Sequence, residues 1–114
     1  MGTFAAMEQV ASRLNAAARA RNLMEAFPRT IQFTLTGEGG ESSRFYVVIK
    51  DGRMSVVAGT ADTADLVVTG KPEALVRVAR GEQDVSHPIA RGDLVVAHGK
   101  VSEMTLFNRV LWAA

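Results

Sequence analysis

Few side chains in this sequence could carry acid–base or metal chemistry. Its only histidines are His87 and His98, and it contains no cysteine. Zinc sites combine several Cys, His or carboxylate ligands, and no such cluster stands beside either histidine at ligand spacing. A histidine could still act as a general base, because the ordinary pKa of imidazole lies near neutral pH. The sequence therefore predicts no metal ion and no cofactor, and it leaves catalysis open.

Two further groups could assist a proton transfer. Asp65 opens one apolar run and Tyr46 lies within another. Asp62 could pair with Asp65, since paired carboxylates perform acid–base catalysis, but aspartate before a strand is more typical of a turn cap. If its strand is regular, His98 points to the same side as Val96. The weak catalytic candidates are therefore His98, His87, Asp65 and Tyr46.

Anion binding is the other chemistry that the sequence permits. Arg44, Arg91 and Lys100 could bind the carboxylate of a fatty acid, although arginine is more often solvated. The glycine-rich segment 37–43 invites comparison with a phosphate-binding loop. No Lys-Ser/Thr pair and no helix follows it, and its two glutamates would repel a phosphate, so it is read as a turn.

Composition narrows the class of protein. At 114 residues and 47% hydrophobic side chains, the chain is expected to form one folded domain, spanning 1–114. Its net charge of +1 gives no support to a nucleic-acid partner. No apolar run approaches the roughly 20 residues of a transmembrane helix, and no secretory signal is evident. We expect a cytoplasmic protein.

Apolar periodicity predicts three helices. Phe4, Met7, Ala11, Leu14 and Ala18 form one stripe of a long helix over about residues 3–26. A second helix begins at the proline of segment 72–80, and a third covers about 102–112, with its serine as N-cap. The apolar side chains of the third helix gather on one face and are Met104, Phe107, Val110 and Leu111.

Alternation and turn signals predict five strands, over about 31–36, 44–50, 53–58, 64–69 and 94–97. The Asp51-Gly52 pair between the second and third strands is typical of a tight hairpin. Segments 45–49 and 66–68 are apolar on both faces. A sheet of this kind needs both faces covered, by helices, by a partner chain or by a ligand. The sheet and the C-terminal helices together are expected within about 31–112.

Three local patterns resemble the sterol carrier protein-2 (SCP2) family when taken in this order. The first is Phe45–Lys50 with the Asp-Gly turn and a second extended run, and the second is Ala64–Thr69. The third is Ile89–Gly99, which is similar to the Phe-x-x-Gly-Lys-Leu-x-Ile-x-Gly ending of the family. The chain departs from the family at Asp93, where lysine is usual, and at Ile89, where phenylalanine is common.

This resemblance implies an α+β fold, with a five-stranded mixed, mostly antiparallel sheet covered by helices and an apolar tunnel beside the C-terminal helices. It also implies non-catalytic binding or transfer of a sterol, fatty acid, acyl-CoA or related lipid. Two alternatives stay open: an enzyme or accessory protein of natural-product or isoprenoid biosynthesis that uses the same pocket, and a dimerisation or assembly module, with a homodimer as one form. The candidate ligand-binding residues are Phe45, Val47, Ile49, Leu66, Val68, Ile89, Leu94, Val96, Met104, Phe107, Val110 and Leu111.

Overall fold

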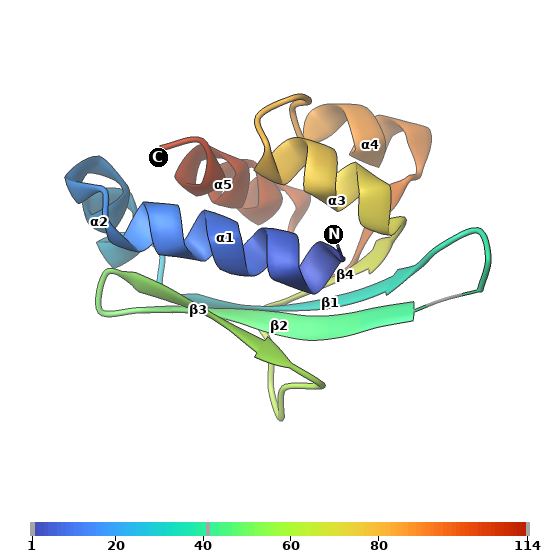
Figure 1. Ribbon diagram of the computed structural model, residues 1–114, viewed down its shortest axis with the longest axis horizontal. Coiled ribbons are helices and arrows are strands. Elements are labelled where there is room, and N and C mark those ends of the chain that lie inside the picture. The colour runs from blue at the N-terminus through green and yellow to red at the C-terminus, as the bar shows by residue number, and fades with distance from the viewer. Residues whose placement is uncertain (1, 41, 114) are drawn as a thin grey trace.

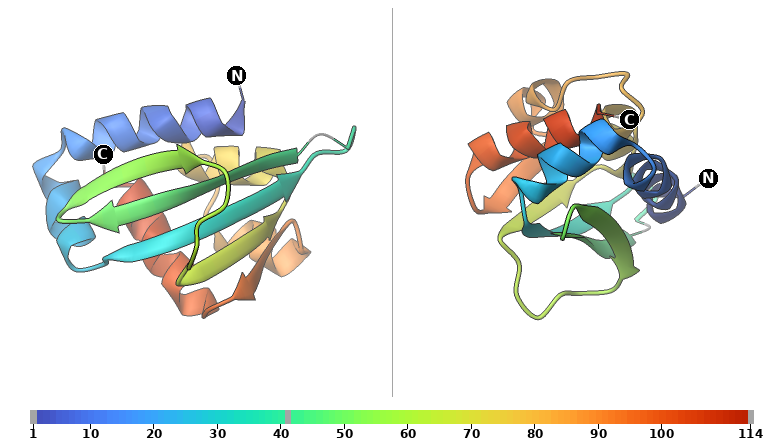
Figure 2. Two further views of the ribbon diagram at one scale, coloured as in Figure 1. Left: turned by 90° about the horizontal axis from the view of Figure 1, so that it is seen from below. Right: turned by 90° about the vertical axis from the view of Figure 1, so that its left-hand side faces the viewer.

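Helices and strands form two layers in this protein, for which a computed structural model describes residues 2–40 and 42–113 (Figure 1). All the helices of these residues lie on one face of a single sheet (Figures 1 and 2). None of these helices has the length and apolar character needed to cross a membrane. In chain order the elements are α1 (Thr3–Asn15), α2 (Ala18–Glu25), β1 (Arg29–Thr36), β2 (Ser42–Lys50), β3 (Arg53–Ala58), β4 (Leu66–Gly70), α3 (Pro72–Ala79), α4 (Ser86–Arg91), β5 (Leu94–His98) and α5 (Val101–Leu111).

The sheet has the strand order β3-β2-β1-β4-β5. The pair β1/β4 is parallel, and the other three neighbouring pairs are antiparallel. The parallel pair arises because the chain leaves the edge strand β3 and crosses the sheet before it forms β4 (Figure 2). The predicted α+β fold with a mixed, mostly antiparallel sheet is therefore confirmed.

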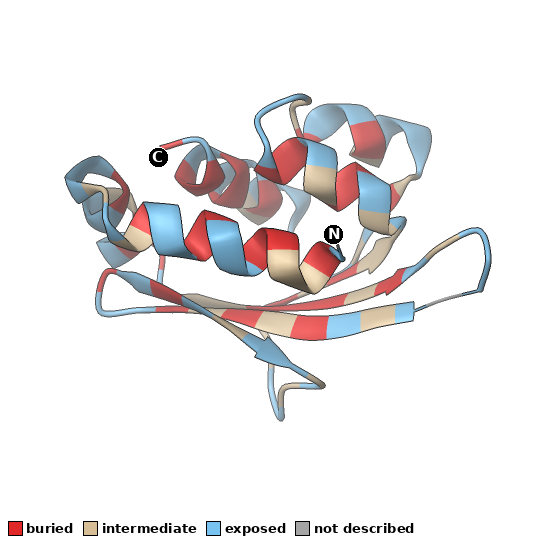
Figure 3. Ribbon diagram, in the orientation of Figure 1, coloured by how far each residue is buried: buried red, intermediate tan, exposed pale blue. Residues whose placement is uncertain are grey.

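One face of the sheet, here called the inner face, packs against the helix layer. Alternate residues of the central strands point into it, and Phe33, Leu35, Phe45 and Val47 are completely buried. Burial is concentrated between the two layers (Figure 3). This alternation is the pattern expected for a sheet with one solvated face.

The opposite, outer face has no helix over it in the described residues (Figure 1). The helices of the described residues therefore do not cover both faces, and coverage of the outer face by a partner chain or a ligand stays a prediction. Val57 is 38% exposed and Val95 is 47% exposed on that side. The loop 59–65 lies against part of the face, held by Gln32, whose side chain accepts from Ala61 N at 2.8 Å and donates to Gly59 O at 3.2 Å.

The predicted single N-terminal helix over 3–26 is wrong, because the chain forms α1 and α2 with an extended residue between them, Ala17. The Asn15 side chain explains where α1 ends. Its amide donates to Met54 O at 2.9 Å and accepts from Met54 N at 2.8 Å. Met54 belongs to β3, an edge strand whose outward backbone groups would otherwise lack partners. This tertiary contact outweighs the helix propensity of the alanine-rich sequence.

The C-terminal half contains one helix that the sequence pattern did not predict. A residue before proline favours an extended conformation, yet His87 and Pro88 both lie in α4. Proline is tolerated here because the first turn of a helix leaves its N–H groups without intrahelical partners. The final helix α5 begins after Lys100 as its N-cap, so Ser102 lies inside the helix rather than at its cap.

Candidate apolar ligand site

An aromatic cluster fills the layer between α1, α5 and the inner face of the sheet. The ring centroids of Phe33 and Phe45 are 5.3 Å apart in a stacked arrangement. Phe33 and Phe107 of α5 are 6.0 Å apart, and Phe4 meets Phe45 edge-on at 6.0 Å. Aromatic pairs in such geometries stabilise a core beyond their buried area. This part of the molecule can hold apolar groups and offers little directional chemistry.

The structure brings the candidate ligand-binding residues together in this same layer. Those that are buried belong to one hydrophobic cluster, and Ile89 and Val96 pack against it while remaining partly exposed. They come from β2, β4, α4, β5 and α5, so segments far apart in sequence share one apolar environment. The buried members are Phe45, Val47, Ile49, Leu66, Val68, Leu94, Met104, Phe107, Val110 and Leu111.

A small apolar groove opens between α2 and α5, with a volume of about 140 Å³. Phe27 and Val110 line it and are also members of the buried cluster, so the groove adjoins the core directly. Leu106 forms part of its rim and is 41% exposed. The sequence pattern predicted only Val110 among these residues. The full lining is Leu23, Ala26, Phe27, Leu106, Arg109 and Val110.

An ion pair with a bifurcated hydrogen bond ties α5 to the sheet close to this groove. Arg29 Nε lies 3.0 Å and 3.1 Å from the two carboxylate oxygens of Glu103. The Arg29 guanidinium carbon also sits 5.0 Å from the ring centroid of Phe27, a groove residue. Two partners therefore fix Arg29, and the first turn of α5 is held against the start of β1. The pair joins residues 74 positions apart, and no sequence signal indicated it.

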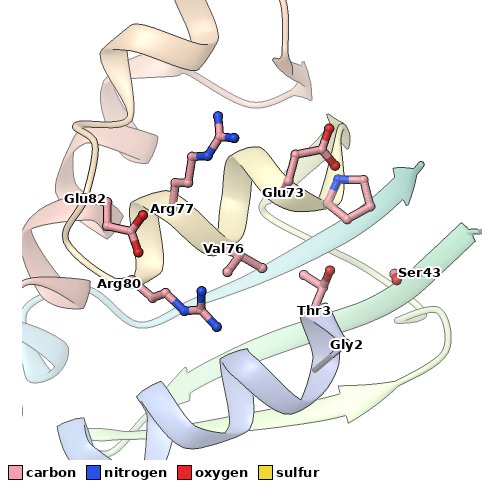
Figure 4. Close-up of a pocket in the computed structure, with 9 residues that line it drawn as sticks. Gly2, Thr3, Ser43, Glu73, Val76, Arg77, Arg80 and Glu82 are labelled. Carbon is pink, nitrogen blue, oxygen red and sulfur yellow. The ribbon is translucent and has the colours of Figure 1, made fainter. Parts of the chain in front are cut away.

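A larger hollow of about 550 Å³ lies between the start of α1, α3 and β2 (Figure 4). Its lining differs in kind from that of the apolar groove. Arg77 and Arg80 contribute positive charge, while Glu73 and Glu82 contribute negative charge. Such mixed, open surroundings suit water and not an apolar ligand.

The weak catalytic candidates do not converge on the apolar layer. Tyr46 is a half-buried residue that lies opposite Gln32 and Val57 in the sheet register, and Asp65 is exposed. One Asp65 carboxylate oxygen accepts a hydrogen bond from Thr30 N at 2.8 Å. This bond and that from Asp65 N to Thr30 O, also 2.8 Å, give Asp65 a structural contact at the start of β4.

The histidines are both exposed, and they lie on separate elements. His87 is in α4. His98 was expected on the side of Val96, but a bulge in the β4/β5 ladder places His98 opposite Val67 and Val96 opposite Val68. An extra residue in a strand reverses the facing of the residues after it, so His98 shares the outer side with Val67. In the described residues no group of three or more His, Cys, Asp or Glu side chains is placed to hold a metal ion.

The candidate cations for a ligand carboxylate are also dispersed. Arg44 is exposed and lines a hollow of about 450 Å³ beneath the loop 59–65, on the outer face. Arg91 Nε lies 3.8 Å from Asp93, and Lys100 is an exposed residue before α5. Arg109 lines the apolar groove, and sequence reasoning did not single it out.

An α+β domain with an apolar layer between a helical cover and a five-stranded sheet is the class of protein that this geometry defines. The sequence profile of the SCP-2 sterol transfer family matches residues 7–111. The chain therefore belongs to the SCP-2 sterol transfer family, as the sequence resemblance predicted. Among curated proteins, none matches the sequence.

Solved structures share the same fold at low sequence identity. The apo form of sterol carrier protein 2 from Yarrowia lipolytica has a TM-score of 0.74 and 18% identity, covering 97% of this chain and 88% of its own. Palmitated SCP2L2 from Aedes aegypti gives 0.72 and 16%, covering 98% and 96%. A protein described as UbiJ-SCP2, a ubiquinone synthesis protein, gives 0.59 and 19%, covering 91% and 86%. These similarities concern the fold.

Proposed function

We propose that this protein binds and transfers an apolar ligand, such as a sterol, fatty acid, acyl-CoA or related lipid, without a covalent step. Membership of the SCP-2 sterol transfer family supports binding of an apolar molecule. The observation that carries the proposal for this chain is the groove between α2 and α5. Phe27 and Val110 belong both to that groove and to the buried cluster, and this continuity of apolar side chains supports entry of a ligand at the groove.

The proposed ligand would lie between α5 and the sheet, among the buried candidate ligand-binding residues named above. Its main stabilisation is apolar burial, at about 25 cal/mol per Å² of apolar surface removed from water. The aromatic cluster occupies this space in the ligand-free protein, so side chains must move when a ligand enters. Met7, Met24 and Met104 are buried there, and unbranched methionines repack at low cost.

Two matched substitutions on α5 test the route. Leu106 lies at the groove, whereas Val101, 52% exposed, is absent from its lining. We expect Leu106→Asp to weaken uptake of a pyrene-labelled fatty acid at least tenfold, because it places a carboxylate where the apolar chain enters. Val101→Asp should leave uptake unchanged. Equal effects of the two variants, or no uptake by the wild-type protein, would contradict the proposal.

The accessory role in isoprenoid biosynthesis remains an alternative, supported by the likeness in fold to the protein described as UbiJ-SCP2. In the enzyme version of this alternative, His98→Ala should abolish turnover of an apolar substrate. In the carrier version the same variant should retain its lipid. The outer position of His98 favours the carrier version, because that side chain lies on the sheet face opposite to the apolar layer.

The assembly alternative concerns the outer face of the sheet, where Val57 and Val95 are exposed. A homodimer formed through this face would bury both valines. Sedimentation of the purified chain, combined with mass spectrometry of an organic extract, separates the alternatives. A lipid-free obligate dimer would favour assembly, whereas a monomer with a co-purified lipid would favour the carrier. We propose the cytoplasm as its compartment.

A further inference from the structure

The mixed-charge hollow between α1, α3 and β2 contains hydrogen-bond donors that the proposed function leaves unused (Figure 4). Its volume is about 550 Å³, and its lining includes Gly2 and Thr3 at the start of α1, Ser43 of β2 and Arg80 at the end of α3. Backbone N–H groups, hydroxyl groups and guanidinium groups are the donors that commonly bind phosphate in proteins. This hollow brings all three kinds together.

The first turn of α1 supplies the backbone donors. Helical hydrogen bonding begins with Ala6 N, which donates to Gly2 O at 3.0 Å, so the amides of Thr3, Phe4 and Ala5 have no partner within the helix. Gly2, the N-cap, makes no side-chain cap hydrogen bond, and the first turn carries no acidic residue. The aligned peptide dipoles of this 13-residue helix therefore leave a partial positive charge beside the hollow, which favours an anion.

Thr3 gives a second, independent indication of a ligand. The residue is 6% exposed, and its hydroxyl forms no hydrogen bond with another residue that the structure describes. Figure 4 shows the hydroxyl directed from α1 into the hollow, toward α3. Polar groups in enclosed positions generally have a partner, and a ligand in the hollow would provide one.

Arg80 supplies a full positive charge. Figure 4 shows its guanidinium on the side of α3 that faces α1, whereas the guanidinium of Arg77 points away from α1. Within residues 2–40 and 42–113, neither arginine forms an ion pair. A guanidinium can bind a phosphate through two parallel hydrogen bonds, so Arg80 is available to hold an anion that the start of α1 also attracts.

Two carboxylates in the lining oppose such an anion. Glu73 lies in the first turn of α3, at the end of that helix remote from Arg80. Glu82 follows Arg80 by two residues and lines the same hollow, so its charge acts directly against an anion bound by Arg80. Binding therefore depends on the directed donors of α1 and Arg80, and removal of the Glu82 charge should strengthen it.

We propose that this hollow binds a phosphate group, held by the first-turn amides of α1, the hydroxyls of Thr3 and Ser43 and the guanidinium of Arg80. The inference goes beyond the proposed function and does not rest on it. The group could belong to a soluble phosphate ester or to the headgroup of a lipid. A lipid is compatible because Ser43 precedes Phe45 by two residues on the same face of β2, which places the hollow at one end of the inner face.

Titration of the isotope-labelled protein with inorganic phosphate, followed by NMR at constant ionic strength, tests the site. We expect saturable shifts of the amide resonances of Thr3, Phe4 and Ala5. Thr3→Val keeps the shape and charge of the side chain but removes the hydroxyl, and it should weaken phosphate binding about three- to tenfold. Thr3→Ser should retain binding. The matched control, Thr105→Val at an exposed position of α5, should leave the affinity unchanged.

Charge variants test the part played by α3. Arg80→Gln should weaken phosphate binding about tenfold, because it removes the cation that contacts the anion. Arg19→Gln removes the same charge from an exposed position of α2 outside the lining, so it measures the effect of net charge alone. Glu82→Gln should strengthen binding. Since Arg80 is exposed, these variants keep the test valid even if Thr3→Val does not fold.

Methyl phosphate and hexyl phosphate distinguish the two sources of the group. Tighter binding of hexyl phosphate, with added shifts at Phe45, would assign the hollow to a lipid headgroup. Equal binding of the two esters would assign it to a soluble phosphate ester. Both results support a phosphate site.

Three results would overturn the inference. The first is the absence of saturable shifts at the start of α1 when phosphate is added. The second is a folded Thr3→Val variant that binds phosphate as well as the wild type. The third is an Arg80→Gln variant that loses no more affinity than Arg19→Gln, because the anion would then respond to net charge and not to this hollow.

Discussion

The two faces of the sheet carry similar apolar residues but meet different surroundings. Val47 on the inner face is completely buried, whereas Val57 and Val95 on the outer face are 38% and 47% exposed. All the helices of the described chain cover the inner face, and the outer face has the loop 59–65 over part of it (Figures 1 and 3). A valine in the sequence therefore indicates a strand more reliably than it indicates that its own side chain is buried.

The inner face of the sheet therefore stabilises the protein, whereas the outer face remains available for contact with other molecules. The inner face buries large apolar side chains and also borders the proposed ligand path. On the outer face, the Gln32 side chain is 5% exposed, and its amide oxygen accepts a hydrogen bond from Ala61 N of the loop 59–65. Substitutions confined to one face, compared by their effect on the free energy of unfolding, measure how much each face contributes to stability.

The largest effect is expected from Phe33→Ala on the inner face. Phe33 stacks on Phe45 and contacts Phe107, and it is completely buried. Its loss should lower the free energy of unfolding by about 3–5 kcal/mol through lost burial and a residual cavity. Val95→Ala on the outer face should change that free energy by no more than about 0.5 kcal/mol. Urea denaturation measures both, and similar losses would remove the distinction between the faces.

A smaller loss, of about 2 kcal/mol, is expected from Gln32→Ala. The Gln32 amide contacts Phe45 O and Gly59 O, and it accepts from Ala61 N, so its removal leaves several backbone groups without partners. Hydrogen exchange at the Ala61 amide should accelerate at the same time. Thr34→Ala, two residues along the same face, is the control. If Gln32→Ala is no more destabilising than the control, the loop is not held by this amide.

The ion pair between Arg29 and Glu103 should contribute less, about 0.5–1 kcal/mol in a double-mutant cycle. Their side chains are 33% and 20% exposed, so solvent screens the pair in part, although Arg29 Nε lies within hydrogen-bond distance of both carboxylate oxygens. The cycle compares Arg29→Met, Glu103→Gln and the double variant, with and without about 1 M NaCl. The pair between Lys71 and Asp93, with Lys71 48% exposed, should show weaker coupling. A coupling of zero for Arg29 and Glu103 would mean that apolar packing alone holds α5 to the sheet.

Local sequence patterns predicted the strands, the Asp51-Gly52 hairpin and the last two long helices, because these elements follow from side-chain period and turn chemistry. They could not predict the break between α1 and α2, which depends on a contact from Asn15 to the distant strand β3. Nor could they predict the facing of His98, which a bulge in the β4/β5 ladder reverses. The sequence did predict that most of the apolar candidates are buried together, because burial follows side-chain period, and their binding of a ligand stays a prediction. The groove between α2 and α5 could not be predicted, because Phe27 and Leu106 come together only in the folded chain.

The smallest expected effect concerns Asp84, at the start of α4 in the helix layer. Hydrogen bonds from the Ser86 backbone and then its hydroxyl lower the pKa of Asp84 below the ordinary 3.8; burial opposes them in part, and the charge of His87 adds a smaller lowering. A carboxyl whose pKa is lowered by folding adds stability above its ordinary pKa, and this stability is lost as the pH falls through the folded value. Asp84→Asn should therefore be slightly less stable than the wild type at neutral pH, and the difference should shrink below about pH 4. Urea unfolding from pH 7 to pH 2 measures this, with Glu82→Gln as a control for net charge. A difference that stays constant across that range would mean that the Asp84 charge has no part in holding α4 over the covered face.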